Sequence, residues 1–170
     1  MKALEPIDRT QRAQVVALTG KYIEQASRIF LRHFVMLPVF FDLSGRLAGM
    51  YKVHGRTRCI RYNPWLFARY YEENLAVTVP HEVSHYLTDT IHGRRGIRPH
   101  GKEWREIMAL FGADDQVIAD FDLSGIPGRS YQTEDYRCAC RSHRLTHIRH
   151  NRIRRGWRYY CKSCNTELRQ

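Results

Sequence analysis

The amino-acid sequence predicts an α+β fold, with helices before and after a small sheet, followed by a short module of different composition. Three observations support this: an apolar repeat with helical spacing comes first, short alternating segments follow, and helical spacing then returns. The chain has 170 residues, of which 43% are apolar, which is enough for one domain with its own core. We therefore expect one main domain and a small appendage.

The first helix is predicted between Gln11 and Leu37. Apolar residues recur there at steps of three and four, which is the spacing of an amphipathic helix. Pro38 ends it, because proline lacks the backbone N–H that an interior helical position donates. The apolar positions are Val15, Leu18, Tyr22, Ile23, Ala26, Ile29 and Phe30.

Residues 39–62 predict a three-stranded antiparallel meander. Turn sequences at 42–45 and around Gly55 divide this stretch into three short apolar segments. Consecutive strands joined by tight turns pair antiparallel. We therefore expect the first strand to pair with the second, and the second with the third.

Three helices are predicted after the strands. Asn63-Pro64 begins the first, because asparagine is a common N-cap and proline is favoured at the first helical position. The second covers about 74–92 and contains Pro80, which removes a backbone donor and predicts a kink or restart just before residue 81. The third covers 102–111. Gly93 and Gly112 directly follow the second and third helices, where glycine commonly ends a helix.

The second of these helices carries the motif His81-Glu82-x-x-His85. Positions i and i+4 share one helix face, so both imidazoles can reach a single zinc ion at about 2.0–2.1 Å. Glu82 lies about 100° further round the helix, where a carboxylate can act as general base for an attacking water. A chain of this composition is expected to contain the motif by chance only about 0.02 times. The pattern therefore predicts a catalytic zinc site of the metallopeptidase type.

A third zinc ligand must come from outside the motif, because catalytic zinc usually keeps three protein ligands and one open position. Glu103 and Glu106 on the following helix are geometrically possible. His100 is the better candidate, because it follows a glycine-rich turn and starts that helix, so its ring can turn back towards the motif. Spacing alone makes His100 the favourite and does not exclude the glutamates.

Other side chains near the motif are candidates for lesser roles. Asp89 lies one turn beyond His85 and is either a hydrogen-bond acceptor for its ring or a solvated acid on the helix surface. Tyr62, Tyr86 and Tyr131 can each supply a hydroxyl to the transition state, and the sequence does not choose among them.

Four cysteines near the C-terminus form two close pairs. Cys138-Ala139-Cys140 and Cys161-Lys162-Ser163-Cys164 are separated by twenty residues, as in a zinc ribbon with four cysteine ligands. We expect the residues between the pairs to form a hairpin or two short strands. His143 is an alternative ligand in place of Cys138 or Cys140. So short a module cannot build a large core, so its metal would supply the folding energy.

The positive charge of the chain lies mostly in this module. Residues 1–136 carry a formal charge of +2 and residues 137–170 carry +9, and we place the domain boundary between them. Arginine pairs with phosphate and exposed aromatic rings stack on unpaired bases. Nucleic acid is therefore favoured over a merely solvated face, an anionic membrane surface or an acidic protein. The candidate contacts are Arg141, Arg144, Arg149, Arg152, Arg154, Arg155, Trp157 and Arg158.

The longer pattern His81-Glu82-x-x-His85, fourteen residues, then His100-Gly101-x-x-Trp104 resembles the SprT family of zinc metallopeptidases. Spartan, the eukaryotic relative, is the DNA–protein crosslink protease. The resemblance continues in residues 60–64 and in 136–168, so it spans most of the chain. It implies a minimal zincin-like fold with His81, His85 and His100 as zinc ligands and Glu82 as the catalytic base. It also adds weight to DNA as a partner.

We therefore expect a zinc-dependent metalloendopeptidase that acts on DNA-associated proteins, with one catalytic and one structural zinc per chain. The alternative is a DNA-binding or regulatory zinc protein whose zincin-like domain is a relic. Glu82 favours the enzyme, because it is not a ligand and a relic has no reason to keep it. The N-terminal sequence lacks a signal peptide and no stretch reaches about 18 apolar residues. We expect a cytoplasmic monomer that does not contact membranes.

Overall fold

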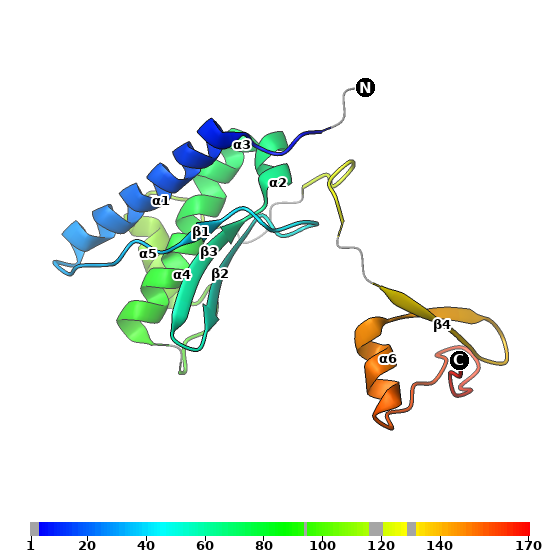
Figure 1. Cartoon of the computed structure of the whole chain (residues 1–170). Coiled ribbons are helices and arrows are strands. Elements are labelled where there is room, and N and C mark those ends of the chain that lie inside the picture. Colours follow the sequence, from blue (N-terminus) through cyan, green and yellow to red (C-terminus); the bar gives the residue numbers. More distant parts are fainter. Residues whose placement is uncertain (1–3, 94, 116–120, 129–131) are drawn as a thin grey trace. The chain divides into compact units, whose positions relative to one another are not determined.

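The computed structural model describes residues 4–93, 95–115, 121–128 and 132–170 (Figure 1). The chain separates into two compact units, Met1–Gly128 and Arg129–Gln170. Strand β4 (Thr133–Arg137) pairs with β5 (Ser142–Thr146) inside the second unit. The boundary predicted after residue 136 falls within β4. It was placed where the charge of the chain changes, whereas the hydrogen-bonded strand pair of the second unit begins a few residues earlier.

Helix α1 (Arg9–Ile29) opens the first unit. Asp8 and Gln11 form a capping box, in which each side chain accepts a hydrogen bond from the other residue's backbone N–H. The face that packs on the core carries three of the residues predicted for it. The buried residues of α1 are Val15, Thr19, Ile23 and Ala26.

The predicted end of the first helix at Leu37 is wrong, since α1 ends at Ile29. Leu31 adopts a left-handed conformation with φ of 46°, which ends a helix. The backbone N–H of Arg32 donates to Ser27 O, and that of Phe34 donates to Ser27 Oγ. These bonds fold the chain back on the helix end before Pro38 is reached.

The sheet of the first unit is mixed. Its strands are β1 (Val39–Phe40), β2 (Gly49–His54) and β3 (Thr57–Tyr62), in the order β1-β3-β2. β2 and β3 form the expected antiparallel hairpin, whereas β1 runs parallel to β3. The prediction of an antiparallel meander is therefore wrong for β1.

The segment 41–48 explains this strand order. It passes the end of β3, where the side-chain amide of Asn63 donates to Gly45 O and Leu47 O. The backbone N–H of Asn63 donates to Ala48 O. These bonds hold the segment as a crossing connection, so β2 lies on the opposite edge of β3 from β1.

The helices after the sheet follow the sequence closely. Asn63 caps the first of them by accepting from the N–H groups of Trp65 and Leu66. The expected restart before His81 corresponds to a change from π-helix to α-helix, with Pro80 in the first turn, where no N–H is needed. The helices are α2 (Pro64–Arg69), α3 (Tyr71–Glu73), π-helix η1 (Asn74–Thr78), α4 (Val79–His92) and α5 (Lys102–Leu110).

Helix α4 is the central element of the first unit, because it packs against α1, α5 and β2 (Figure 1). Val79, Val83 and Leu87 on α4 are fully buried and join the main core. The packing on several sides also buries polar residues of α4, notably Glu82 and Ser84. The helix that carries the His81 motif therefore has little freedom to rotate or shift.

The second unit contains β4, β5 and α6 (His147–Arg154) around a small core of its own. The prediction of a hairpin between the cysteine pairs is wrong in part, since one strand and a helix lie there. β5 pairs with β4, so the two strands flank the first cysteine pair. The core residues are Tyr136, Leu145, Cys161 and Leu168.

The helices of the chain are short or rich in charged side chains. The longest described helix, α1, has 21 residues and includes Arg9, Arg12, Lys21, Glu24 and Arg28. Within the part of the chain that the structure describes, no helix combines the length and the apolar character that crossing a bilayer requires.

Candidate functional site

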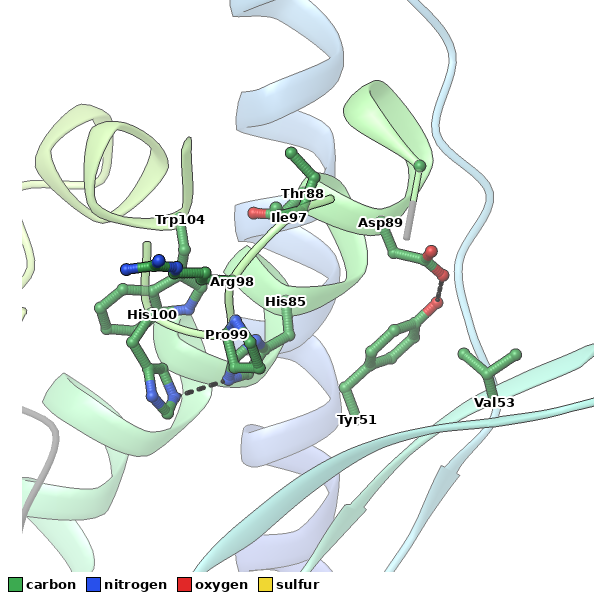
Figure 2. Close-up of a pocket in the computed structure, with 11 residues that line it drawn as sticks. Tyr51, Val53, His85, Thr88, Asp89, Ile97, Arg98, Pro99, His100 and Trp104 are labelled. Carbon is green, nitrogen blue, oxygen red and sulfur yellow. Dashed lines mark hydrogen bonds between the residues drawn. The ribbon is translucent and has the colours of Figure 1, made fainter. Parts of the chain in front are cut away.

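Three histidines converge at one point of the first unit. His81 and His85 come from successive turns of α4, and His100 comes from the loop before α5. The Nε2 atom of His85 lies 3.1 Å from that of His81 and 3.0 Å from that of His100, and the remaining pair is 3.1 Å apart. Figure 2 shows His85 and His100 facing each other across this point.

The donor set fits a zinc ion. Tetrahedral Zn–N bonds of about 2.0–2.1 Å place ligand nitrogens about 3.3–3.4 Å apart, only slightly more than the separations of 3.0–3.1 Å found here. A neutral imidazole has one N–H and one free lone pair, so three Nε2 atoms turned inwards cannot all satisfy one another by hydrogen bonds. One cation at their centre satisfies all three.

The loop before α5 places His100 in the group. His100 has a φ of 56°, and the backbone N–H of Gly101 donates to Arg98 O, which turns the chain back towards α4. Among the described residues, the cluster able to hold a metal here contains His100 and neither Glu103 nor Glu106. The local turn therefore favours the histidine over both glutamates.

Trp104 packs against the three histidines. Its side chain is fully buried, as expected for a core residue, and its ring centroid lies 4.8 Å from those of His81 and His100. The indole Nε1 donates to the backbone oxygen of His81 over 3.3 Å. The tryptophan thus ties the start of the motif to α5.

Burial keeps the histidines neutral. Desolvation is the main cause that lowers the pKa of His81 to about 4 and that of His85 to about 3, and the neighbouring imidazoles add to it. Burial also lowers the pKa of His100. A histidine binds a metal only through an unprotonated nitrogen, so all three are ready to bind at neutral pH.

Glu82 lies on α4 beside the histidines and is almost completely buried, with 5% of its surface exposed. The backbone N–H of Tyr51 on β2 donates to Glu82 Oε2 over 2.6 Å. Burial raises the pKa of the carboxyl to about 8, although this hydrogen bond acts in the opposite direction. A carboxyl group with a pKa near neutrality can both accept and return a proton, as general acid–base catalysis requires.

A hollow of about 260 Å³ opens beside His85 and His100. It lies between β2, α4 and the loop before α5, as Figure 2 shows. Its position next to the histidines makes it the natural place for part of a bound molecule. Besides the two histidines, it is lined by Tyr51, Val53, Thr88, Asp89, Gly93, Ile97, Arg98, Pro99 and Trp104.

Asp89 has neither of the roles considered for it. Its side chain is only 8% exposed, so it is not a solvated surface acid. It accepts a hydrogen bond from the hydroxyl of Tyr51 over 2.6 Å and lies 3.4 Å from Arg58 Nε. The carboxylate therefore faces β2 and β3, and its observed partners do not include the ring of His85.

The hydroxyls of Tyr62 and Tyr86, two of the tyrosines considered as donors, have partners away from the histidines. The hydroxyl of Tyr62 is fully buried and pairs with Thr19 Oγ1, and that of Tyr86 donates to Val35 O. Tyr131 lies outside the described residues. Strand pairing and helix packing turn the first two side chains towards α1 and towards the chain that follows it.

Sequence reasoning missed Gly49 and Tyr51, which bring β2 to the site. A Cβ at residue 49 would lie 2.7 Å from Glu82 Cγ, so only glycine leaves room for the carboxylate there. The period-two alternation of the strand places Gly49, Tyr51 and Val53 on one face. That alternation was the available signal, but it does not reveal which helix this face meets.

The four cysteines of the second unit also converge. Their sulfur atoms lie within 4.8 Å of one another, with 3.4 Å between Cys138 and Cys140 and 3.7 Å between Cys140 and Cys161. Tetrahedral Zn–S bonds of about 2.3 Å place two sulfurs about 3.8 Å apart. The group completed by Cys164 therefore fits one zinc ion with no position left for substrate.

Two neighbours influence these thiols. Backbone N–H groups of Cys164 and Ser163 stabilise the thiolate of Cys161 and lower its pKa to about 5. His143 Nε2 lies 3.2 Å from Cys138 Sγ. The structure thus places His143 at the edge of the cluster, where it can donate a hydrogen bond to a thiolate, and the candidate metal group consists of the four cysteines.

The eight residues predicted to contact nucleic acid are all exposed. Trp157 has 63% of its surface exposed, and the guanidinium of Arg152 lies 5.9 Å from its ring centroid. Arg158 has an acidic partner, since its Nε lies 3.7 Å from Glu167 Oε1. Helix α6 and the segment after it thus present a cationic surface with an aromatic ring. The predicted residues on this stretch are Arg149, Arg152, Arg154, Arg155, Trp157 and Arg158.

Comparison with known proteins connects both units to one group of relatives. Residues 19–122 match the SprT-like family. Protein SprT of Shewanella oneidensis is 40% identical over 147 residues, which cover 85% of this chain and 90% of that protein. Protein SprT of Vibrio parahaemolyticus is 34% identical over 86% of each chain, and that of Pasteurella multocida is 33% identical over 91% of each. No solved structure matches the chain.

These matches agree with the resemblance to the SprT family that the histidine pattern indicated. The matched range of the family includes the three histidines, Glu82 and the glycine of β2 that lies against it. The similarity to the curated relatives covers more than four fifths of the chain. The chain therefore belongs to the SprT-like family.

Proposed function

We propose that the protein is a zinc-dependent metalloendopeptidase with a minimal zincin-like fold in its first unit. The observation that carries the proposal is Glu82, a buried carboxyl group that directly follows His81 on α4 and is held by the N–H of Tyr51. The same helix supplies two of the three converging imidazoles. Burying a carboxylate is costly. A purely structural metal site would gain nothing from it.

In this proposal His81, His85 and His100 hold the metal. A zinc ion bound there would supply Lewis-acid chemistry, polarising the peptide carbonyl and lowering the pKa of a water molecule. Glu82 takes a proton from the attacking water and passes it to the leaving amine. The N–H of Tyr51 keeps one carboxylate oxygen in place, which leaves the other free to move the proton.

The test is cleavage of a denatured protein by the zinc-loaded chain and by Glu82→Gln. The amide keeps the shape of the side chain but cannot take the proton, so the rate should fall at least about 100-fold while zinc content stays the same. Glu106→Gln is a matched control, because Glu106 is an exposed residue of α5 outside the histidine group. Cleavage by Glu82→Gln at the wild-type rate would show that the base is wrongly assigned.

We further propose that the second unit binds nucleic acid and brings the peptidase to DNA-associated proteins. Support comes from the eight exposed residues and from the excess of arginine over acidic residues in this part of the chain. Neutralising phosphates releases counterions, which favours binding to such a surface. Holding enzyme and substrate on one DNA molecule raises their effective concentration without changing the site.

The alternative is a DNA-binding or regulatory protein whose first unit has no catalytic role. It explains the second unit equally well, but it leaves the buried Glu82 and the hollow beside His85 without a purpose. The two functions differ in one experiment. Only the enzyme cleaves a denatured protein in the absence of DNA, and only the enzyme loses that activity in Glu82→Gln.

A further inference from the structure

We propose that the hollow beside His85 is a specificity subsite that takes one large apolar side chain, from a residue flanking the scissile bond of a protein substrate. This inference rests on the proposed peptidase function and names the kind of peptide that the site would select. It follows from the position of the hollow, its size, the chemistry of its walls and the state of the acidic group in its lining.

The position of the hollow connects it to the reacting centre. His85 and His100 belong both to the candidate metal group and to the lining of the hollow. Figure 2 shows Tyr51 and Val53 of β2 on one side and Pro99 of the loop on the other, with His85 between them. When a peptide group of a substrate lies at the histidines, the side chain of a neighbouring residue can therefore reach the hollow.

The size of the hollow suits a large side chain. Its volume is about 260 Å³, whereas a cavity of about 150 Å³ is enough to hold benzene. Apolar side chains form much of the wall, and they come from three separate elements. These are Val53 on β2, Ile97 and Pro99 in the loop, and Trp104 on α5.

The acidic group at the far end is already neutralised. Asp89 accepts a hydrogen bond of 2.6 Å from the hydroxyl of Tyr51 and lies 3.4 Å from Arg58 Nε. A lysine or arginine side chain entering the hollow would therefore find a carboxylate that already has partners. The lining also includes Arg98, a residue of like charge.

A charged side chain of either sign would also lose its hydration among the apolar parts of the wall, which costs free energy. A neutral apolar side chain needs no partner and gains free energy by leaving water. Tyr51 is held at both ends, by its N–H to Glu82 and by its hydroxyl to Asp89. The wall is thus preorganised, so little ordering is needed when a side chain enters.

The first test maps cleavage sites. Zinc-loaded protein digests a mixture of denatured proteins, and mass spectrometry identifies the new chain ends. We expect large apolar residues such as phenylalanine, leucine and methionine to be enriched about tenfold or more over alanine and glycine at one of the two positions flanking the cut.

Variants that fill the hollow should change this profile. Val53→Phe places a ring in the hollow and should shift cleavage from large to small residues at that position, and Ile97→Phe should do the same from the opposite wall. Val35→Phe is the matched control, because it makes a similar enlargement at a residue that is 61% exposed and outside the hollow. Its profile should equal that of the wild type.

A second readout does not depend on turnover. Calorimetry measures the affinity of the zinc-loaded protein for two hydroxamates, acetohydroxamic acid and 3-phenylpropanohydroxamic acid. The phenyl compound should bind about tenfold more tightly or better to the wild type and to Val35→Phe, and this advantage should disappear in Val53→Phe.

The outcomes separate the two proposals. Cleavage without a positional preference, a preference for basic residues, or an unchanged profile in both filled variants overturns the subsite and leaves the peptidase standing. Absence of cleavage refutes the proposed function. The ratio of the two hydroxamate affinities then tests whether the hollow binds a large apolar group. Equal affinities in the wild type overturn the subsite in that case too.

Discussion

Tyr51 on β2 donates its backbone N–H to Glu82 on α4 over 2.6 Å, so a strand of the sheet fixes the carboxylate of the HExxH motif. The same strand makes room for that carboxylate at Gly49. A Cβ added there would lie 2.7 Å from Glu82 Cγ and Oε1 and 2.8 Å from Thr78 Cγ2. The position of the proposed base therefore depends on β2 as much as on its own helix.

The first prediction is that Gly49→Ala reduces hydrolysis on the order of 100-fold, because the methyl group displaces Glu82 from its hydrogen bond. Zinc content should stay unchanged, since the atoms nearest the new methyl belong to Glu82 and Thr78 and not to the histidines. The matched control is Gly20→Ala in α1, where the added Cβ would lie 3.8 Å from Met36 Sδ, an ordinary contact. Rates, zinc content and melting temperatures of both variants check this, and equal rates would contradict it.

The contact between β2 and Glu82 could not be predicted from the sequence, for a reason of strand order. In the expected meander β2 is the middle strand, and its second edge pairs with β1. In the observed order β1-β3-β2 that edge is free of β1, and the N–H of Tyr51 reaches α4 instead. The order depends on the crossing segment 41–48, which Asn63 holds through contacts distant in sequence.

The features that the sequence did predict are local ones. His81 and His85 lie on one helix face because of their spacing, and Asn63 caps α2 because its side chain reaches the next N–H groups. His100 reaches the same point because one tight turn, closed by the bond from Gly101 N–H to Arg98 O, directs the chain back towards α4. By contrast, the end of α1 depends on Leu31 and Ser27, whose left-handed turn has no clear signal in the apolar repeat.

The second prediction concerns zinc content. Elemental analysis should find two zinc ions per chain, because the histidine and cysteine groups are separate and each is complete. His100→Ala should remove one ion, and the double change Cys161→Ser with Cys164→Ser should remove the other. Controls are His33→Ala and Cys59→Ser, which lie outside both groups and should retain two. A wild-type count of one that the serine changes leave unaltered would exclude the ribbon.

The third prediction is the pH dependence of the metal-free protein. Burial raises the pKa of Glu82 to about 8 from an ordinary value of 4.5, so the folded state binds one more proton than the unfolded state between these values. The contribution of this proton to the free energy of unfolding is complete below pH 4.5 and is lost as the pH rises through 8. Below 6.5 the lowered pKa values of His81 and His85 act in the opposite sense, since there the unfolded state binds more protons.

Urea unfolding in the presence of a chelator checks this prediction between pH 6.5 and 8.5, where only the Glu82 contribution varies among these groups. The wild type should lose stability over this range relative to Glu82→Gln, whose side chain does not ionise. The cysteines titrate equally in both proteins, so they cancel in the comparison. Parallel curves for the two proteins would show that the carboxyl group is not held in its neutral form.

The fourth prediction concerns Trp157, whose ring is 63% exposed beside Arg152. Stacking of a base on an aromatic ring is worth about 1–3 kcal/mol, so Trp157→Ala should weaken binding to single-stranded DNA by about 5- to 150-fold. Ile148→Ala is the matched control, because Ile148 is also 63% exposed in the same unit but has no aromatic face. Fluorescence anisotropy with a labelled oligonucleotide measures both, and equal losses would argue against stacking.

The last prediction assigns the DNA surface to the second unit. A chain that ends at Gly128 loses the whole of that unit, including β4, and its formal charge falls from +11 to +3. The logarithm of the binding constant falls linearly with the logarithm of salt concentration, and the slope reports the number of phosphates neutralised. The intact chain should show a steep slope, whereas the shortened chain should bind weakly and with a shallow one.

The shortened chain also separates binding from chemistry. Because the histidine group and Glu82 lie in Met1–Gly128, zinc at that site and cleavage of a free denatured protein should survive the truncation. Acceleration by DNA should disappear, since enzyme and substrate are no longer held on the same molecule. Anisotropy across a salt series and cleavage of a DNA-binding protein with and without DNA measure the two effects. Unchanged affinity after truncation would place the DNA surface on the first unit and refute the role proposed for the arginines of α6.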